Sequence, residues 1–122
     1  MEGEMKIVKM NEVPREQYVT PLFTVADITR QNLLESKDLK LSIVNFGRGT
    51  RNKFHTHDGD QVLIVTAGKG IVATEKEEKI VSAGDIVLFP AGEIHWHGAT
   101  KDSEFSHIYV TRAGVNMTQV EK

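Results

Sequence analysis

The sequence of 122 residues contains no cysteine, only three prolines and no long uninterrupted apolar run. The absence of cysteine excludes disulfides, thiolate metal ligands and a cysteine nucleophile, and it fits a cytoplasmic location. No apolar run approaches the roughly 20 residues of a membrane-spanning helix. The first residues are polar and lead into no apolar segment of the kind found in secretory signal peptides. We therefore expect a cytoplasmic protein that does not enter a membrane.

An excess of positive charge is also missing. Fifteen Lys and Arg residues against 17 Asp and Glu residues give a formal net charge of −2, with no basic cluster. Proteins that bind nucleic acid through its phosphates need such a cluster, so nucleic acid is not an expected partner. No serine lies in the Gly-x-Ser-x-Gly context of a hydrolase nucleophile. The length suits one domain, and 39% hydrophobic residues suffice for a core.

From Leu39 onward the sequence predicts β-strands. Leu39, Leu41 and Ile43 alternate with polar residues, which is the period of a half-buried strand. Gly68-Lys69-Gly70 indicates a tight turn. Further strands are expected at 61–67, 71–74, 80–81, 86–89 and 104–110. Short strands separated by turns predict an antiparallel sandwich or barrel. The expected core or wall residues are Ile43, Phe54, Leu63, Val65, Phe89 and Trp96.

The two ends of the chain give weaker signals. Residues 7–10 (Ile7 to Met10) have the composition of a short strand, and 31–36 (Gln31 to Ser36) fit a single helical turn. Pro14 and Pro21 prevent a long helix across this region. We therefore divide the chain into an N-terminal arm with short strands (1–38), a β-barrel (39–112) and a C-terminal tail (113–122).

All five histidines lie after residue 54, and four of them form two pairs with spacing i, i+2. One pair is His55 and His57, and the other is His95 and His97. Residues two apart in a strand project from the same face, so each pair presents two imidazoles to one side of a sheet. Imidazole is a common ligand of divalent metals, and this pattern favours a metal site over isolated surface histidines. Gln61 follows a short turn and could direct its amide oxygen into the same site.

Two sequence motifs around these residues resemble those of the cupin family. Gly49-x5-His55-x-His57-x3-Gln61-x6-Gly68 resembles the first cupin motif, with glutamine at the position of the usual acidic ligand. Gly84-x5-Pro90-x-Gly92-x2-His95 resembles the second, with Ala99 in place of its terminal Asn. The resemblance implies an all-β fold, a small cupin-type β-barrel or jelly roll of two antiparallel sheets with a metal inside. The implied metal ligands are His55, His57, Gln61 and His95.

A finer resemblance points to one group within that family. The stretches 63–68, 95–99 and 106–108 resemble small single-domain cupins related to bacterial manganese-dependent hydroxynitrile lyases. The implied cofactor is one divalent metal ion, with manganese favoured; the ligand types alone also allow iron, nickel or zinc. Four neutral ligands leave the full +2 charge on the ion, which favours binding of an anionic oxygen.

The remaining histidines are candidate catalytic residues. His97 shares a strand face with His95 and is expected to act as a general base or acid, because an imidazole titrates near neutral pH. His107, on a later strand, is expected to be its partner or a polar wall of the pocket. The alternative for both is that they only orient a ligand or a bound water.

The expected function is that of a metal-dependent enzyme on a small-molecule substrate, of the lyase type that cleaves a C–C bond. Two alternatives stay open: an iron-dependent dioxygenase, and a barrel without catalytic activity that binds a metal and a small molecule. Small cupins often pair by exchanging an N-terminal strand, so the resemblance implies a homodimer, with Ile7 to Met10 as the exchanged segment. Trp96, opposite in parity to the ligands, is expected outside the metal pocket, under the arm or at the dimer contact.

Overall fold

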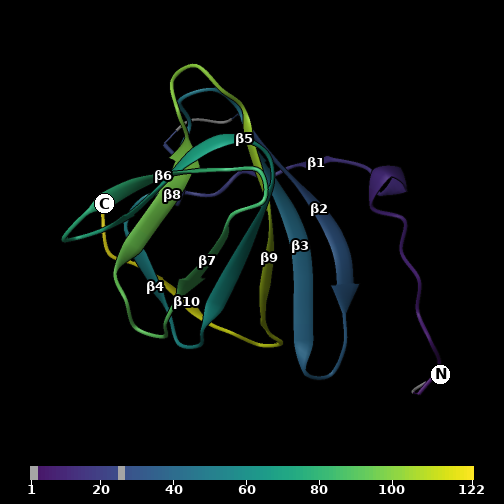
Figure 1. Ribbon diagram of the computed structural model, residues 1–122. Coiled ribbons are helices and arrows are strands. Elements are labelled where there is room, and N and C mark those ends of the chain that lie inside the picture. The colour runs from purple at the N-terminus through teal and green to yellow at the C-terminus, as the bar shows by residue number, and fades with distance from the viewer. Residues whose placement is uncertain (1–2, 25–26) are drawn as a thin grey trace.

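The computed structural model describes residues 3–24 and 27–122, and it confirms the all-β fold class (Figure 1). Every pairing among the strands of these residues is antiparallel. A short 3₁₀ helix, η1, spans Met10–Glu12. The strands are β1 (Glu16–Gln17), β2 (Ile28–Glu35), β3 (Leu39–Phe46), β4 (His55–His57), β5 (Gln61–Thr74), β6 (Glu78–Ser82), β7 (Ile86–Phe89), β8 (His95–Ala99), β9 (Phe105–Arg112) and β10 (Met117–Gln119).

The long strand β5 joins two sheets. Its first half pairs with β9 and β7, in a sheet of order β1-β2-β3-β9-β5-β7. Its second half pairs with β8 and β6, in a sheet of order β10-β4-β8-β5-β6. The two sheets curl around a common interior, as expected for a jelly roll. The chain's histidines therefore come together from strands of both sheets.

The turn predicted at Gly68-Lys69-Gly70 is wrong, because β5 continues through it to Thr74. The strand bends here, with a register shift between Val65 and Ala67 and a φ of 73° at Gly68. A Cβ at Gly68 would collide with the backbone carbonyl of Glu104. The glycines thus let β5 pass closely under β9 as it changes sheets, without reversing its direction.

Two predictions for the N-terminal region are also wrong. Residues 7–9 form no strand, and Met10 begins η1, because no other described strand offers a partner to this segment. The helical turn expected at Gln31–Ser36 is instead most of β2, which pairs along its length with β3. The side-chain amide of Gln31 donates to the carbonyl of Val13 at 2.8 Å. Tertiary pairing therefore overrides the weak local signal.

The regions assigned to an arm and a tail contribute strands to the sheets. The boundary at 38/39 falls between β2 and β3, which form one hairpin. Within the tail, β10 pairs with β4, the strand that carries His55 and His57. Residues 1, 2, 25 and 26 of the predicted arm lie outside the described residues.

The core agrees with prediction at Leu63, Val65 and Phe89, which belong to the buried apolar cluster. Ile43 is buried, but it lies on the opposite face of β3 from Val44, whose side chain lines the interior cavity. The interior face of β3 thus consists of the even-numbered residues, which inverts the parity expected from the apolar residues Leu39, Leu41 and Ile43. The outer face is apolar as well, so alternation alone could not identify the inner one.

Two of the three predicted aromatic residues, Trp96 and Phe54, lie beside one arginine, outside the interior. Trp96 is buried, and the guanidinium of Arg51 lies 4.1 Å from its ring centroid. Phe54 is only half-buried and lies 5.9 Å from the same guanidinium. Trp96 therefore packs outside the cavity as expected, with Arg51 as a covering group.

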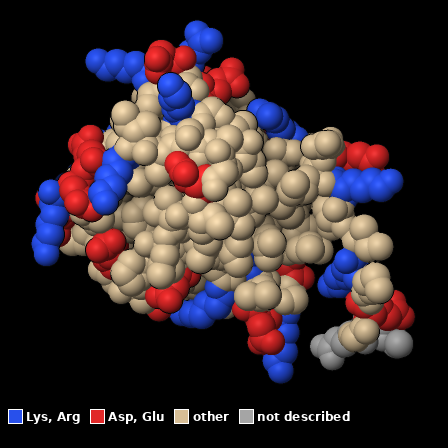
Figure 2. All heavy atoms as spheres, viewed as in Figure 1, with Lys and Arg blue, Asp and Glu red and all other residues tan. Residues whose placement is uncertain are grey.

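The surface carries charges of both signs. Figure 2 shows Lys and Arg side chains intermixed with Asp and Glu side chains around the periphery of the face in view. Among the helical segments of the described residues, none is long and apolar enough to cross a membrane.

Candidate metal centre

Four of the five histidines lie on two neighbouring strands. β4 carries His55 and His57, β8 carries His95 and His97, and the two strands pair at His55 and His95. Each pair lies two residues apart on one strand, which is the arrangement that the spacing of the histidines predicted. Because the strands are adjacent, the side chains that share a face project into one interior space.

The distances between these imidazoles define two overlapping groups of three. The ring centroids of His55, His57 and His95 are separated by 4.4 to 5.4 Å. By the positions of potential ligand nitrogens, His55, His95 and His97 lie within 4.8 Å of one another. His55 and His95 belong to both groups. The structure thus contains a buried three-histidine cluster that could hold a divalent metal ion.

Backbone carbonyls fix the orientation of the two shared histidines. Nδ1 of His55 lies 2.6 Å from the carbonyl oxygen of Lys53, and Nδ1 of His95 lies 2.8 Å from that of Glu93. A carbonyl only accepts, so each Nδ1 carries the proton and each Nε2 has a free lone pair. This is the tautomer and the outer hydrogen bond that a metal-binding imidazole requires.

Several buried polar atoms at this site have no hydrogen-bond partner. They include Nε2 of His95, Nδ1 of His57 and Oε1 of Gln61. Leaving such atoms unpaired costs about 1–3 kcal/mol each, and a bound cation would satisfy lone pairs of this kind. The donor set of imidazoles and an amide oxygen fits a divalent transition metal. The residues present therefore fit the ion that the sequence predicted.

Burial keeps these histidines neutral. Desolvation, followed by the neighbouring His95, lowers the pKa of His55 from 6.5 to about 4. Desolvation, followed by His55, lowers the pKa of His57 to about 4, and desolvation lowers that of His95 to about 4 against the opposing effect of the Glu93 carbonyl. Neutral imidazoles are the form that binds metals, so few protons compete with a metal at pH 7.

His97 and His107, the predicted catalytic pair, lie together in the interior. Both are almost fully buried, and their ring centroids are 4.8 Å apart in an edge-to-face arrangement. Burial, and then the neighbouring His107, lowers the pKa of His97 well below 6.5. Burial lowers the pKa of His107 to about 4. Both nitrogens of His107 are buried without a hydrogen-bond partner.

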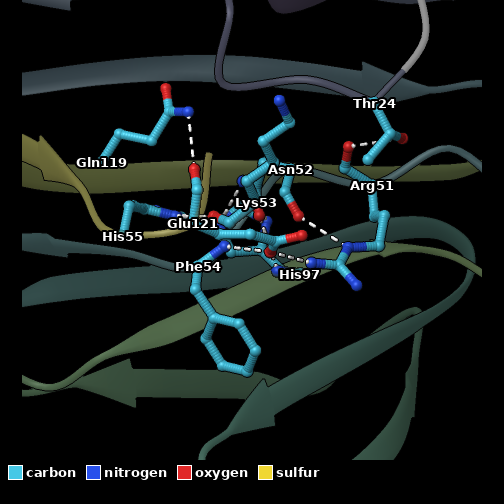
Figure 3. Close-up of polar contacts among 9 residues, drawn as sticks. All are labelled: Thr24, Arg51, Asn52, Lys53, Phe54, His55, His97, Gln119 and Glu121. Carbon is cyan, nitrogen blue, oxygen red and sulfur yellow. Dashed lines mark hydrogen bonds and ion pairs between the residues drawn. The ribbon is translucent and has the colours of Figure 1, made fainter.

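Asn52 positions His97, and the sequence analysis missed it. Its side-chain oxygen accepts from the backbone N–H of His97 at 2.8 Å, and its Nδ2 lies 3.3 Å from Nε2 of the imidazole (Figure 3). Asn52 lies in an isolated bridge between strands, where a lone asparagine looks like an ordinary loop residue. Its role depends on a contact with a residue 45 positions away, which no local pattern reveals.

A cavity of about 200 Å³ adjoins the cluster. His55, His57, Gln61, His97 and His107 all line it. Ligand sites for drug-sized molecules usually span about 300–1,000 Å³, so this volume indicates a small ligand. His95 belongs to the cluster but stacks on Phe89 with a centroid distance of 3.9 Å. A small molecule in this cavity would therefore lie beside the candidate metal ligands and beside His97 and His107.

Residues 42–111 match the family described as cupin domain. The chain is a cupin. The match covers more than half of this cupin's 122 residues and includes all five histidines. It thereby confirms the family that the two motifs indicated, and with it a single cupin domain.

Curated relatives with known names match part of this cupin. It is 43% identical over 70 residues to (R)-mandelonitrile lyase from Granulicella tundricola, a match that covers 55% of this chain and 52% of the relative. It is 30% identical over 63 residues to acireductone dioxygenase from Frankia alni, covering 48% of this chain and 31% of that protein. The matched region thus spans about half or less of these relatives' length.

Solved structures share the fold over nearly the whole chain. A cupin-like protein from Thermotoga maritima has a TM-score of 0.83 at 28% identity, with 91% of this chain and 89% of that chain covered. The polyketide cyclase RemF from Streptomyces resistomycificus has a TM-score of 0.87 at 17% identity, covering 98% and 87%. The second likeness concerns the fold alone.

Proposed function

We propose that this cupin is a metal-dependent lyase that cleaves the C–C bond of a cyanohydrin. The proposal is carried by the close approach of His55, His57 and His95, together with 43% identity over 70 residues to a mandelonitrile lyase. A divalent ion, with manganese as the first candidate, would act as a Lewis acid for the substrate oxygen when bound. The natural substrate and the metal are both part of the proposal.

The proposed metal ligands are His55, His57, Gln61 and His95. The unpaired atoms of His57, Gln61 and His95 support this set, since each lacks any other partner. His97 differs, because the Asn52 amide already contacts its imidazole. The two possible sets of three histidines differ only in His57 and His97. Measuring the metal content of the His57→Ala and His97→Ala proteins therefore shows which of the two binds the metal. Loss of metal only in His97→Ala would assign His97 as a ligand and remove it as the base.

In the proposed reaction, neutral His97 takes the proton from the substrate hydroxyl. The O–H electron pair then forms the carbonyl, the C–C bond breaks, and its electron pair leaves with cyanide. The proton passes from His97 to cyanide, so that a cyanohydrin yields an aldehyde and hydrogen cyanide in balance. The lowered pKa of His97 keeps it in the basic form at pH 7, and in this proposal His107, 4.8 Å away between ring centroids, shares the proton.

The direct test supplies the metal-loaded protein with mandelonitrile and follows benzaldehyde by absorbance. We expect release that depends on metal and falls at least tenfold in His97→Ala, by analogy with the usual contribution of general acid–base catalysis, about 10²–10⁴-fold. Equal, slow release by wild-type and variant proteins would reject the lyase assignment. A large thermal shift with metal but no turnover on any substrate would favour a barrel that only binds.

The second candidate is an iron-dependent dioxygenase, supported by the 30% identity to acireductone dioxygenase. The same neutral histidines could hold Fe(II). Oxygen uptake in stoichiometric ratio with a diketone substrate under iron loading would favour this reaction. Absence of uptake, together with cyanohydrin cleavage, would exclude it.

We also propose that the chain forms a homodimer through its N-terminal segment. Met5 and Ile7 are 87% and 80% exposed on a segment that extends away from the barrel (Figure 1). No strand among residues 3–24 and 27–122 pairs with residues 7–10, so this segment would become a strand only against a second copy. Light scattering should give twice the monomer mass, and Ile7→Lys should give the monomer mass. Cytoplasmic location stays a prediction.

A further inference from the structure

Three polar side chains form a row across the interior face of the first sheet. β3 pairs with β9 at Lys40 and Thr111. β9 pairs with β5 at Val110 and Val62, which puts Gln61 opposite Thr111 at the next position. All three residues of the row line the cavity. Neighbouring strands are about 4.8 Å apart, so the α-carbons of Lys40 and Gln61 are separated by about 10 Å.

Within the described part of the chain, the side chains of the row have no hydrogen-bond or ion-pair partner. Oγ1 of Thr111 and Oε1 of Gln61 are buried without a hydrogen bond. Lys40 forms no hydrogen bond or ion pair with any described residue, even though it pairs across the hairpin with exposed Glu35. Unpaired polar groups in an interior are costly unless a ligand meets them.

The cavity around the row is cationic. Among the described residues that line it there is no Asp or Glu, and Lys40 is the one Lys or Arg. A second cation, Arg30, lies on the adjacent strand with its guanidinium 4.2 Å from the ring centroid of Tyr18, which lines the cavity. Nε of Arg30 is also buried without a partner. Arg30 does not itself line the cavity, so Lys40 is the charge that an anionic ligand would meet there.

We propose that Lys40 and Thr111 bind a carboxylate that is distal to the metal-binding oxygens of the substrate, which would therefore be a small hydroxy acid or keto acid with a second carboxylate. Its hydroxyl or keto oxygen and its first carboxylate would reach Gln61, in the same row, and the histidines that line the same cavity. This inference rests on the metal centre of the proposed function, and it names an acid in place of a neutral cyanohydrin as the natural substrate. Thr111 donates its O–H to the carboxylate, and the ammonium of Lys40 provides a charge-assisted hydrogen bond.

The test is calorimetric titration of the manganese-loaded protein with two probes. Malate and its 4-amide share the hydroxyl and the first carboxylate, and they differ only in a distal carboxylate or amide. We expect malate to bind about tenfold tighter, the ratio that 1.4 kcal/mol produces. Lys40→Met should lower the affinity for malate to that for the amide, and it should leave the affinity for the amide unchanged. Thr111→Val should remove part of the preference, about two- to fivefold.

Lys37→Met is the matched control, because Lys37 is exposed in the turn between β2 and β3 and its loss changes the net charge equally. It should retain the full preference for malate. Equal affinity for both probes in the wild-type protein, or equal loss in Lys37→Met and Lys40→Met, overturns the carboxylate site.

The cyanohydrin reaction and the carboxylate site are tested by different measurements, so either can fail without the other. Mandelonitrile cleavage without a malate preference leaves the lyase standing and rejects the acid specificity. A malate preference that Lys40→Met abolishes, without cleavage of mandelonitrile, rejects the cyanohydrin reaction and retains the acid-binding row.

Discussion

The carboxylate of Glu121 accepts a hydrogen bond from the guanidinium of Arg51 at 2.6 Å and another from the backbone N–H of Phe54 at 2.9 Å (Figure 3). The same Arg51 lies over Trp96 on β8. The end of the chain is thereby tied to the segment that leads into His55. Because β10 also pairs with β4, the C-terminal residues support the strand of two proposed ligands.

Replacing Glu121 with alanine should loosen this support. The ion pair is partly exposed, so we expect a loss of only about 1 kcal/mol in the free energy of unfolding. We also expect metal affinity to fall a few-fold, as His55 becomes less well held. Urea unfolding and metal titration measure the two effects. Lys122→Ala is the neighbouring control and should match wild type; an identical result for Glu121→Ala would show that the C-terminus does not support the site.

Asn52→Ala should destabilise the protein by about 1–3 kcal/mol, because the buried backbone N–H of His97 loses its acceptor. Asn52→Asp retains that acceptor and places a carboxylate beside the imidazole. The aspartate should raise the pKa of His97 and shift the pH dependence of cleavage to higher pH. Thermal unfolding and a pH profile distinguish these effects. A packing role alone predicts lost stability in both variants and an unmoved profile.

The metal-free protein should lose stability as the pH falls below about 6.5. The pKa of His107 is lowered from 6.5 to about 4 by burial, and those of His55, His57 and His95 fall to similar values. Between these values the unfolded chain binds more protons than the folded one, so the free energy of unfolding decreases with decreasing pH. The contribution of these buried neutral histidines to the free energy of unfolding is fully present above pH 6.5, and it is lost as the pH falls to about 4. Thermal unfolding followed by circular dichroism between pH 4 and 7, with EDTA present, measures this effect. A stability that does not change with pH would show that the histidines are solvated.

Gln61→Glu should hold the metal more tightly and cleave the substrate more slowly. The added carboxylate reduces the net charge of the loaded site from +2 to +1, which weakens its hold on an anionic oxygen. Gln61→Leu, of similar size but without an oxygen, should lose metal affinity instead. Metal analysis after dialysis and initial rates of cleavage give the two readouts. Faster cleavage by the glutamate variant would contradict the reasoning from charge.

The histidine spacing was informative because strand parity converts i, i+2 into a shared face wherever a strand forms. His55 with His57, and His95 with His97, could therefore be placed before the fold was known. The interior face of β3 could not, because Ile43 and Val44 are equally apolar and both are buried. The sequence predicts a turn where the structure has a bend at Gly68, because glycine permits a change of direction without specifying its size.

By itself, the sequence determined the strand-rich fold class, the cupin motifs and the residue types that a metal could bind, because those properties reside in local periodicity and spacing. Only the tertiary structure decided which atoms were left without partners, and that Asn52 contacts His97 or Lys40 shares a row with Gln61. Those relationships join strands distant in the chain, and their geometry depends on sheet pairing, which local sequence does not specify.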